Sequence, residues 1–162
     1  MDDRDRIALV VEHLAHSRII SAPNNPFRLR CEFARAAATD EIEAAAERRS
    51  IPDGVRALWS VARASTWFVD IDYGQWGLRL WAPAEVIDQT EEYERRRSDD
   101  ATAGDVVIGE FLGDLDQLVV AADGSVLVAM PLDPRPDWYR VGTSVADFAE
   151  RFERSVGHKF WE

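Results

Sequence analysis

Two apolar runs joined by an Asp-Gly pair constrain the fold of this chain more than any other feature of its sequence. Residues 118–122 precede Asp123 and Gly124, and residues 125–129 follow them. Glycine accepts the positive φ that a tight hairpin turn demands. The pattern therefore predicts a β-hairpin with a two-residue type I′ turn.

Further short segments rich in β-forming residues surround this hairpin. Residues 66–69, 78–81, 106–108 and 138–141 combine Val, Leu, Phe, Trp and Tyr, which are enriched in strands. Residues 27–33 alternate apolar and polar side chains, as a half-buried strand does, and their charged outer face suits the edge of a sheet. Strands grouped together in this way favour a mostly antiparallel sheet.

Helical spacing marks segments on both sides of these strands. The first lies near the N-terminus, where Ile7, Val10 and Leu14 share one helical face. Helices are also predicted at residues 40–49, in a segment beginning near Pro52, and at residues 84–97. A last helix is expected after Thr143 or Ser144, either of which is a suitable N-cap. The predicted fold class is α+β, with helices packed on one side of the sheet.

Composition indicates one globular domain over residues 1–162. The length fits a single domain, and 46% hydrophobic with 30% charged residues is ordinary for a folded protein. Cys31 is the one cysteine, so no internal disulfide can form, which favours a reducing compartment. The charged N-terminus does not resemble a signal peptide, and no apolar run has the length of a membrane span. We therefore expect a cytoplasmic protein.

The net charge of −11 limits the partners that this chain can bind. Phosphate backbones and anionic membranes repel such a surface, so we expect neither direct nucleic-acid binding nor membrane binding. The acidity is uneven, because residues 85–116 hold eleven of the 30 acidic side chains and three of the 19 basic ones. This segment is either a solvated surface that aids solubility or a docking face for a basic partner.

Sequence motifs of catalysis are missing from the chain. It contains neither a glycine-rich phosphate loop nor a nucleophile elbow. Nearly all of its positive charge is arginine, which cannot serve as a base. Cys31 alternates with apolar residues, which is typical of a small core residue rather than a nucleophile. We therefore predict a protein that is not an enzyme and that needs no cofactor and no metal.

Three weaker patterns leave a choice between chemistry and ordinary surface. His13 and His16 have the spacing of a two-histidine metal site, or they are surface histidines. Residues 70–74 resemble the start of a calcium loop but lack its later ligands, so the alternative is a turn flanked by aspartates. Asp114 and Asp116 could pair with that turn as an acid/base couple, or they lie on a solvated face.

The candidate partner-binding residues are acidic or aromatic. Trp76 lies in a glycine-flanked turn, where we expect an exposed aromatic that could anchor a protein interface. The full predicted set is Asp70, Asp72, Tyr73, Trp76, Glu91, Glu92, Asp99, Asp100, Asp114 and Asp116.

A series of short features follows a fixed order between residues 40 and 155. They are Ile51-Pro52 before an amphipathic helix, Tyr73-Gly74 and Gly77 between two strands, Leu80-Trp81-Ala82-Pro83 before a helix, Ile108-Gly109, Gly113-Asp114, Asp123-Gly124 and the closing segment 145–152. In this order and spacing the chain resembles the SMI1/KNR4, or SUKH, superfamily. The resemblance implies an α+β core with a curved sheet over residues 39–155, preceded here by an extension of residues 1–38.

The same resemblance implies a function through protein binding. Bacterial members of the superfamily are immunity proteins that bind and neutralise toxins, often nucleases or nucleic-acid deaminases, and the superfamily has no shared catalytic residues. Nucleases tend to be basic because their substrate is anionic, and an acidic inhibitor suits such a surface. We therefore predict an immunity protein that binds a basic toxin domain. The alternatives are a regulatory or scaffold module with a host protein partner, and an uncharacterised enzyme.

Overall fold

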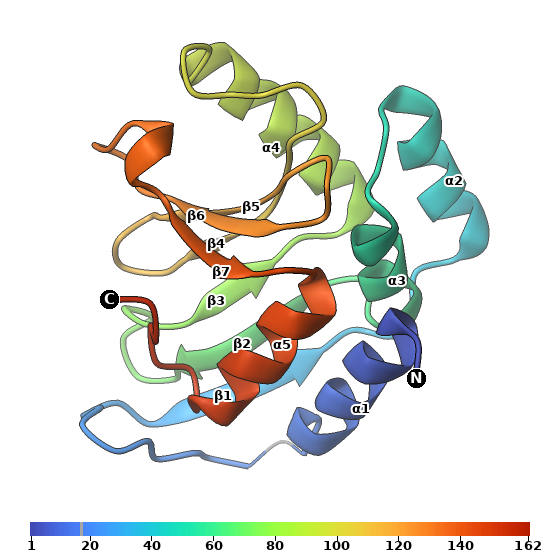
Figure 1. Ribbon diagram of the computed structural model, residues 1–162. Helices are drawn as coiled ribbons and strands as arrows, with labels where there is room; N and C mark the ends of the chain where they lie inside the picture. Colours follow the sequence, from blue (N-terminus) through green and yellow to red (C-terminus); the bar gives the residue numbers. More distant parts are fainter. Residues whose placement is uncertain (17) are drawn as a thin grey trace.

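The computed structural model describes residues 1–16 and 18–162, and in this part of the chain an open antiparallel sheet follows the chain order (Figure 1). Its strands are β1 (Leu29–Phe33), β2 (Ser65–Asp70), β3 (Leu78–Leu80), β4 (Val106–Phe111), β5 (Gln117–Val120), β6 (Val126–Ala129) and β7 (Tyr139–Gly142). Each strand pairs with the next one along the chain. The predicted α+β fold with an antiparallel sheet is confirmed.

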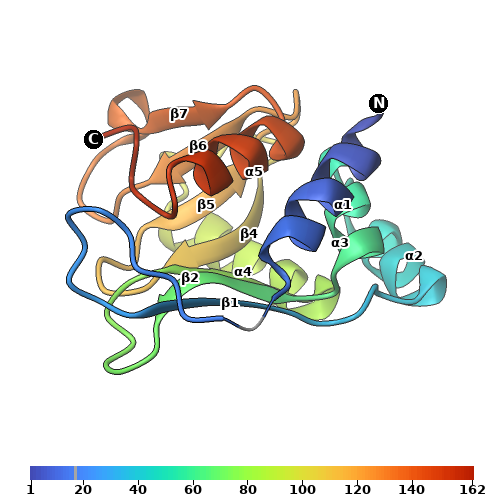
Figure 2. The ribbon, with the colours of Figure 1, turned by 90° about the horizontal axis from the view of Figure 1, so that it is seen from below.

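Three helices form a layer over one face of this sheet. They are α1 (Asp3–Leu14), α3 (Asp53–Val61) and α5 (Val145–Arg154), which contact one another and lie together in both views (Figures 1 and 2). The shorter α2 (Thr39–Arg48) contacts α3 and α4. The helix α4 (Pro83–Arg96) stands apart from the layer in Figure 1 and packs against β4. Among the residues described, no helix is long and apolar enough to cross a membrane.

The core between the sheet and the helix layer is built around Phe152 of α5. Its ring lies 5.5 Å from that of Phe68, 6.1 Å from that of Phe111 and 5.3 Å from that of Phe148. Trp67 of β2 is 6.4 Å away and Trp161 follows from the C-terminal tail at 6.4 Å. Aromatic rings at these separations attract one another beyond their burial. One helical side chain thus joins two strands and the tail.

Polar side chains fix where two of the helices begin. The Asp2 carboxylate accepts a hydrogen bond from the Asp5 amide, and α1 starts at the next residue. Ser144 caps α5 by accepting from the Asp147 amide, so Ser144 rather than Thr143 is the cap. Each cap satisfies a backbone N–H that the helix itself leaves free.

The hairpin at Asp123 and Gly124 is confirmed, but its predicted turn type is wrong. The Gly124 amide donates to the Ala121 carbonyl at 2.8 Å, and the Ala121 amide donates to the Ser125 carbonyl at 2.9 Å. Gly124 has a φ of 88°, whereas Asp123 is not among the residues of positive φ, as a type I′ turn would require. The connection is a three-residue loop closed by a glycine bulge. The Asp123 carboxylate stabilises it by accepting from the Ser125 amide at 2.9 Å.

Residues from the N-terminal extension belong to the same packed unit as the rest. The strand β1 forms an edge of the sheet, as its charged outer face predicts, and begins two residues later than the sequence pattern does. A bridge between Ile20 and Leu29 continues the pairing beyond that edge. The helix α1 contacts both α3 and α5.

Replacing Phe152 tests the role of this ring in the core. Phe152→Ala is expected to lower the free energy of unfolding by about 3–5 kcal/mol. The substitution leaves a cavity where the ring contacted two strands and the C-terminal tail. The matched control is Tyr73→Ala, which removes an exposed ring and should change stability by about 0.5 kcal/mol or less. Urea unfolding followed by tryptophan fluorescence measures both. Equal stability of the two variants would contradict this description of the core.

Candidate binding surface

Alternate connections of the sheet meet at one end of it, because neighbouring strands are antiparallel and follow the chain order. These connections are residues 71–77, 112–116 and 130–138, and they lie with the C-terminus on the left in Figure 1. The segment 97–100 after α4 joins them, because it lines the same hollow as residues 115 and 131–134. We call these four segments the loop end. Most of the predicted partner-binding residues lie in it.

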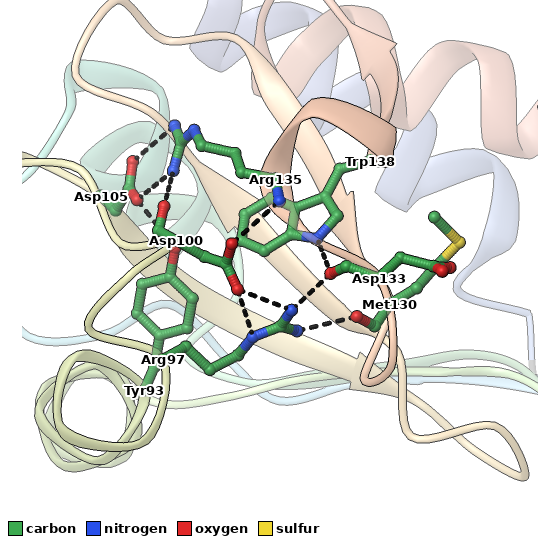
Figure 3. Close-up of polar contacts among 8 residues, drawn as sticks. All are labelled: Tyr93, Arg97, Asp100, Asp105, Met130, Asp133, Arg135 and Trp138. Atoms are coloured by element: carbon green, nitrogen blue, oxygen red, sulfur yellow. Dashed lines mark hydrogen bonds and ion pairs between the residues drawn. The ribbon is translucent and has the colours of Figure 1, made fainter.

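Arg97 ties α4 to the connection between β6 and β7 (Figure 3). Its guanidinium donates to the carbonyl of Met130 at 2.8 Å and to that of Asp133 at 2.6 Å. The same group binds the Asp100 carboxylate at 3.0 Å and lies 5.0 Å from the centre of the Trp138 ring. Trp138 Nε1 in turn donates to the Asp133 carbonyl at 2.9 Å. Three hydrogen bonds therefore hold residues 130–133.

A buried carboxylate completes the network. The Asp105 side chain is 1% exposed and accepts two hydrogen bonds from Arg135, at 2.6 and 3.1 Å. It also accepts from the Tyr93 hydroxyl and the Thr102 amide, both at 2.8 Å. Burial, and then the bond to Asp105, raise the pKa of Tyr93 well above its usual value, so the phenol stays protonated as a donor. The groups satisfy one another, and the arrangement fixes the loops in place.

Lys159 holds the turn between β4 and β5. Its ammonium forms ion pairs with Asp114 and, at 3.6 Å, with Asp116, although only 7% of its side chain is exposed. It also lies 5.8 Å from the centre of the Trp76 ring. The carboxylates of Asp114, Asp116 and Glu162 lie close enough to hold a metal ion, but this lysine is within 3.9 Å of the third as well. The protein's own cation therefore pairs with all three carboxylates and offsets one of their three negative charges.

Two predicted partner-binding residues are buried more deeply than the sequence suggested. Asp70 is buried, and its carboxylate accepts from the amides of Asp72 and Tyr73 at 3.0 and 3.1 Å. It stabilises its own turn and offers almost no surface to a partner. The predicted exposure of Trp76 is wrong, because the ring packs under Lys159 and is half-buried.

Arginines bind several of the other predicted residues. Asp72 pairs with Arg28 at 2.7 Å, and Glu91 pairs with Arg48 of α2 at 2.8 Å. Glu92 lies on α4, outside the loop end, and forms ion pairs with both Arg95 and Arg96. Residues 85–116 therefore do not form one continuous face of free carboxylates. Tyr73 and Asp99 are exposed as predicted.

A hollow of about 570 Å³ opens among three of the four segments of the loop end, 97–100, 112–116 and 130–138. Asp99, Asp133, Leu115 and Leu132 are among the residues that line it. In the part of the chain that the structure describes, neither Asp99 nor Asp133 has an ion pair. Sequence reasoning missed Asp133 and the two leucines. Leu132 follows Pro131 in a proline-rich loop, and an apolar residue in such a loop is the signal that could have found it.

Comparison with known proteins adds no assignment to this geometry. No protein-family profile matches the chain, and no curated protein matches it either. The resemblance to the SMI1/KNR4 superfamily therefore stays a prediction.

Cys31 lies in the core, away from the loop end. It is buried in β1, and its sulfur accepts a hydrogen bond from the Phe68 amide at 3.2 Å. Burial raises the pKa of the Cys31 thiol to about 11, with a smaller opposite effect from the Phe68 hydrogen bond. The thiol is thus protonated and inaccessible at neutral pH.

The Arg135 ion pair can be tested by removing one partner. Arg135→Met should lower the free energy of unfolding by about 2–4 kcal/mol, because Asp105 is left buried without its cation. Adding Asp105→Asn should restore part of that loss, since the unpaired charge is then gone. Arg140→Met, at an exposed arginine of β7, is the control and should have little effect. Urea unfolding measures the stability of all three variants. A loss at Arg135 no larger than at Arg140 would show that the ion pair with Asp105 does not stabilise the fold.

Thiol labelling tests the description of Cys31. At about pH 8, an aromatic disulfide reagent should not modify the native protein, because the reactive thiolate is scarce and buried. In urea the same thiol should react with one equivalent of reagent within minutes. Absorbance of the released thiolate follows the reaction, and rapid labelling of the native protein would show that Cys31 is accessible.

Proposed function

We propose that this protein acts by binding a basic protein at the loop end. The observation that carries the proposal is how charge is used there. Arg97 is bound by Asp100, Arg135 by Asp105, and Lys159 by Asp114 and Asp116. These cations are therefore neutralised within the protein. Arg96, which lines the same hollow, pairs with Glu92 at 3.8 Å, whereas the carboxylates of Asp99 and Asp133 lack ion pairs among the described residues, so these two carboxylates are left for a partner.

The rigidity of the loops supports the same function. Binding is weakened when a surface must lose conformational freedom on association. At the loop end the carbonyls of Met130 and Asp133 are already held by Arg97, and the turn at Asp114 is already held by Lys159. A partner would therefore meet a surface that is fixed before it arrives.

A toxin domain is the partner that best fits this surface and the resemblance together. Toxins that cleave or modify nucleic acids tend to be basic, because their substrates are anionic. A protein of net charge −11 would attract such a domain over long range and could cover its substrate-binding surface. We therefore propose an immunity protein that neutralises a basic toxin by direct binding.

Charge reversal at the hollow tests where binding occurs. The double variant Asp99→Lys and Asp133→Lys should slow association with a basic nuclease toxin domain that the wild type binds, about tenfold, and flatten its salt dependence. The control is Glu12→Lys with Glu47→Lys, which makes the same change in net charge at exposed positions of α1 and α2. Stopped-flow fluorescence measures both rates. Equal rates for the two double variants would remove the loop end from the proposal.

Co-expression tests the biological role separately from the surface. Cells that produce the toxin domain should survive when they also produce this protein. If they die as readily as cells without it, although the two proteins bind, the immunity role is wrong and a regulatory binding module is the better description. If the purified proteins do not bind at all, the proposed function is wrong.

A further inference from the structure

We propose that Leu115 and Leu132 form an apolar anchor at the loop end, which receives an apolar side chain from a basic segment of the partner. The inference rests on the proposed function, and it names the chemistry that the partner must present. Neither leucine belongs to the set predicted from the sequence.

Leu132 is the most exposed large apolar side chain of the described residues, at 95%. The backbone on either side of Leu132 is nevertheless held in place. Met130, two residues before it, and Asp133, directly after it, both have carbonyls bound to Arg97. Trp138 binds the Asp133 carbonyl as well, and Pro131 and Pro134 restrict the backbone on either side. A leucine held out into water on a rigid loop is a feature that folding alone does not require.

Leu115 is presented in a different way. It is 61% exposed, and its φ of 64° lies in the left-handed region. A bulky side chain in that region is strained, and such strain persists only where the surroundings impose it. Here the Phe111 amide donates to the Asp116 carbonyl at 2.8 Å, and Lys159 binds the carboxylates of Asp114 and Asp116. Glycine would relieve the strain, and most of the leucine side chain is exposed, yet the position holds leucine.

The surroundings of the two leucines define what can bind them. Both line the hollow of about 570 Å³, and Asp99 and Asp133 line it too. An apolar side chain placed there would contact both leucines, while lysine or arginine neighbours would reach the two carboxylates. Interfaces commonly combine such an apolar centre with a charged rim. Arg96 and Arg97 line the hollow as well, but they pair with Glu92 and Asp100. A wholly polar basic segment would leave the leucines exposed to water.

Two substitutions separate this anchor from the electrostatic attraction. Leu132→Ser should weaken binding of the toxin domain about tenfold, mainly through faster dissociation, with the association rate nearly unchanged. The control is Leu9→Ser on α1, another exposed leucine, at 42%. It should bind as the wild type does. Surface plasmon resonance with the immobilised toxin domain gives both rate constants.

Leu115→Gly gives a readout that a merely structural role would not produce. Relief of the left-handed strain should raise the melting temperature by about 2–4 °C, whereas loss of the side chain should weaken binding severalfold. A variant that is more stable but binds less tightly supports a leucine retained for its partner. A variant that melts lower would show that Leu115 packs within the fold.

The outcomes distinguish this inference from the proposed function. If the toxin domain binds, but Leu132→Ser and Leu9→Ser dissociate at the same rate, the anchor is wrong and the acidic surface stands alone. If Leu132→Ser slows association instead of accelerating dissociation, the leucine acts on the encounter and the anchor is again wrong. If the wild type does not bind the toxin domain, the proposed function and the anchor fall together.

Discussion

The buried ion pair between Asp105 and Arg135 is the interaction on which the loop end depends. It joins the start of β4 to the connection between β6 and β7, two segments that no strand pairing holds together. A carboxylate with 1% exposure is costly to bury, and it is tolerated here because Arg135, Tyr93 and a backbone amide all donate to it. Arg97 and Trp138 then pack on this fixed base. The buried ion pair beneath the loops thus holds the surface loops in place.

Ion pairs between arginines and carboxylates determine where this acidic protein presents unpaired negative charge. An excess of carboxylates repels itself unless cations are distributed among them. The arginines of α2 bind acids of α4, with Arg48 on Glu91 and Arg49 on Glu94, so the long helix contributes less free charge than its sequence suggests. At the hollow, Asp99 and Asp133 remain without ion pairs among the described residues, beside apolar side chains and the paired arginines Arg96 and Arg97. In the proposed interface, attraction and anchoring would therefore be supplied by different residues on one surface.

Local patterns in the sequence predicted the elements well, and distant contacts explain the errors. Helical spacing at Ile7 and Phe148 and alternation near Cys31 depend on neighbours along the chain, and these elements formed where expected. The environment of Trp76 depends on Lys159, which no local pattern links to it. Asp70 is different, since an aspartate that binds amides two and three residues later is a common turn motif. That signal was present in the sequence.

Leu115 and Leu132 illustrate how the proposed binding surface departs from what folding alone favours. Most of the other large apolar side chains are buried, although Leu9, Ile19 and Tyr73 are also exposed, and the bulky residues Phe68 and Val156 have a positive φ as well. At Leu115 a strained backbone is combined with an exposed apolar group, and both are unfavourable for the isolated chain. Sequences that fold well are consistent at every level, and departures from this consistency concentrate at functional sites. The hydrogen bonds of Arg97 on one side of the hollow and the ion pairs of Lys159 on the other hold the loops in place. They therefore keep the two leucines from folding back onto the surface.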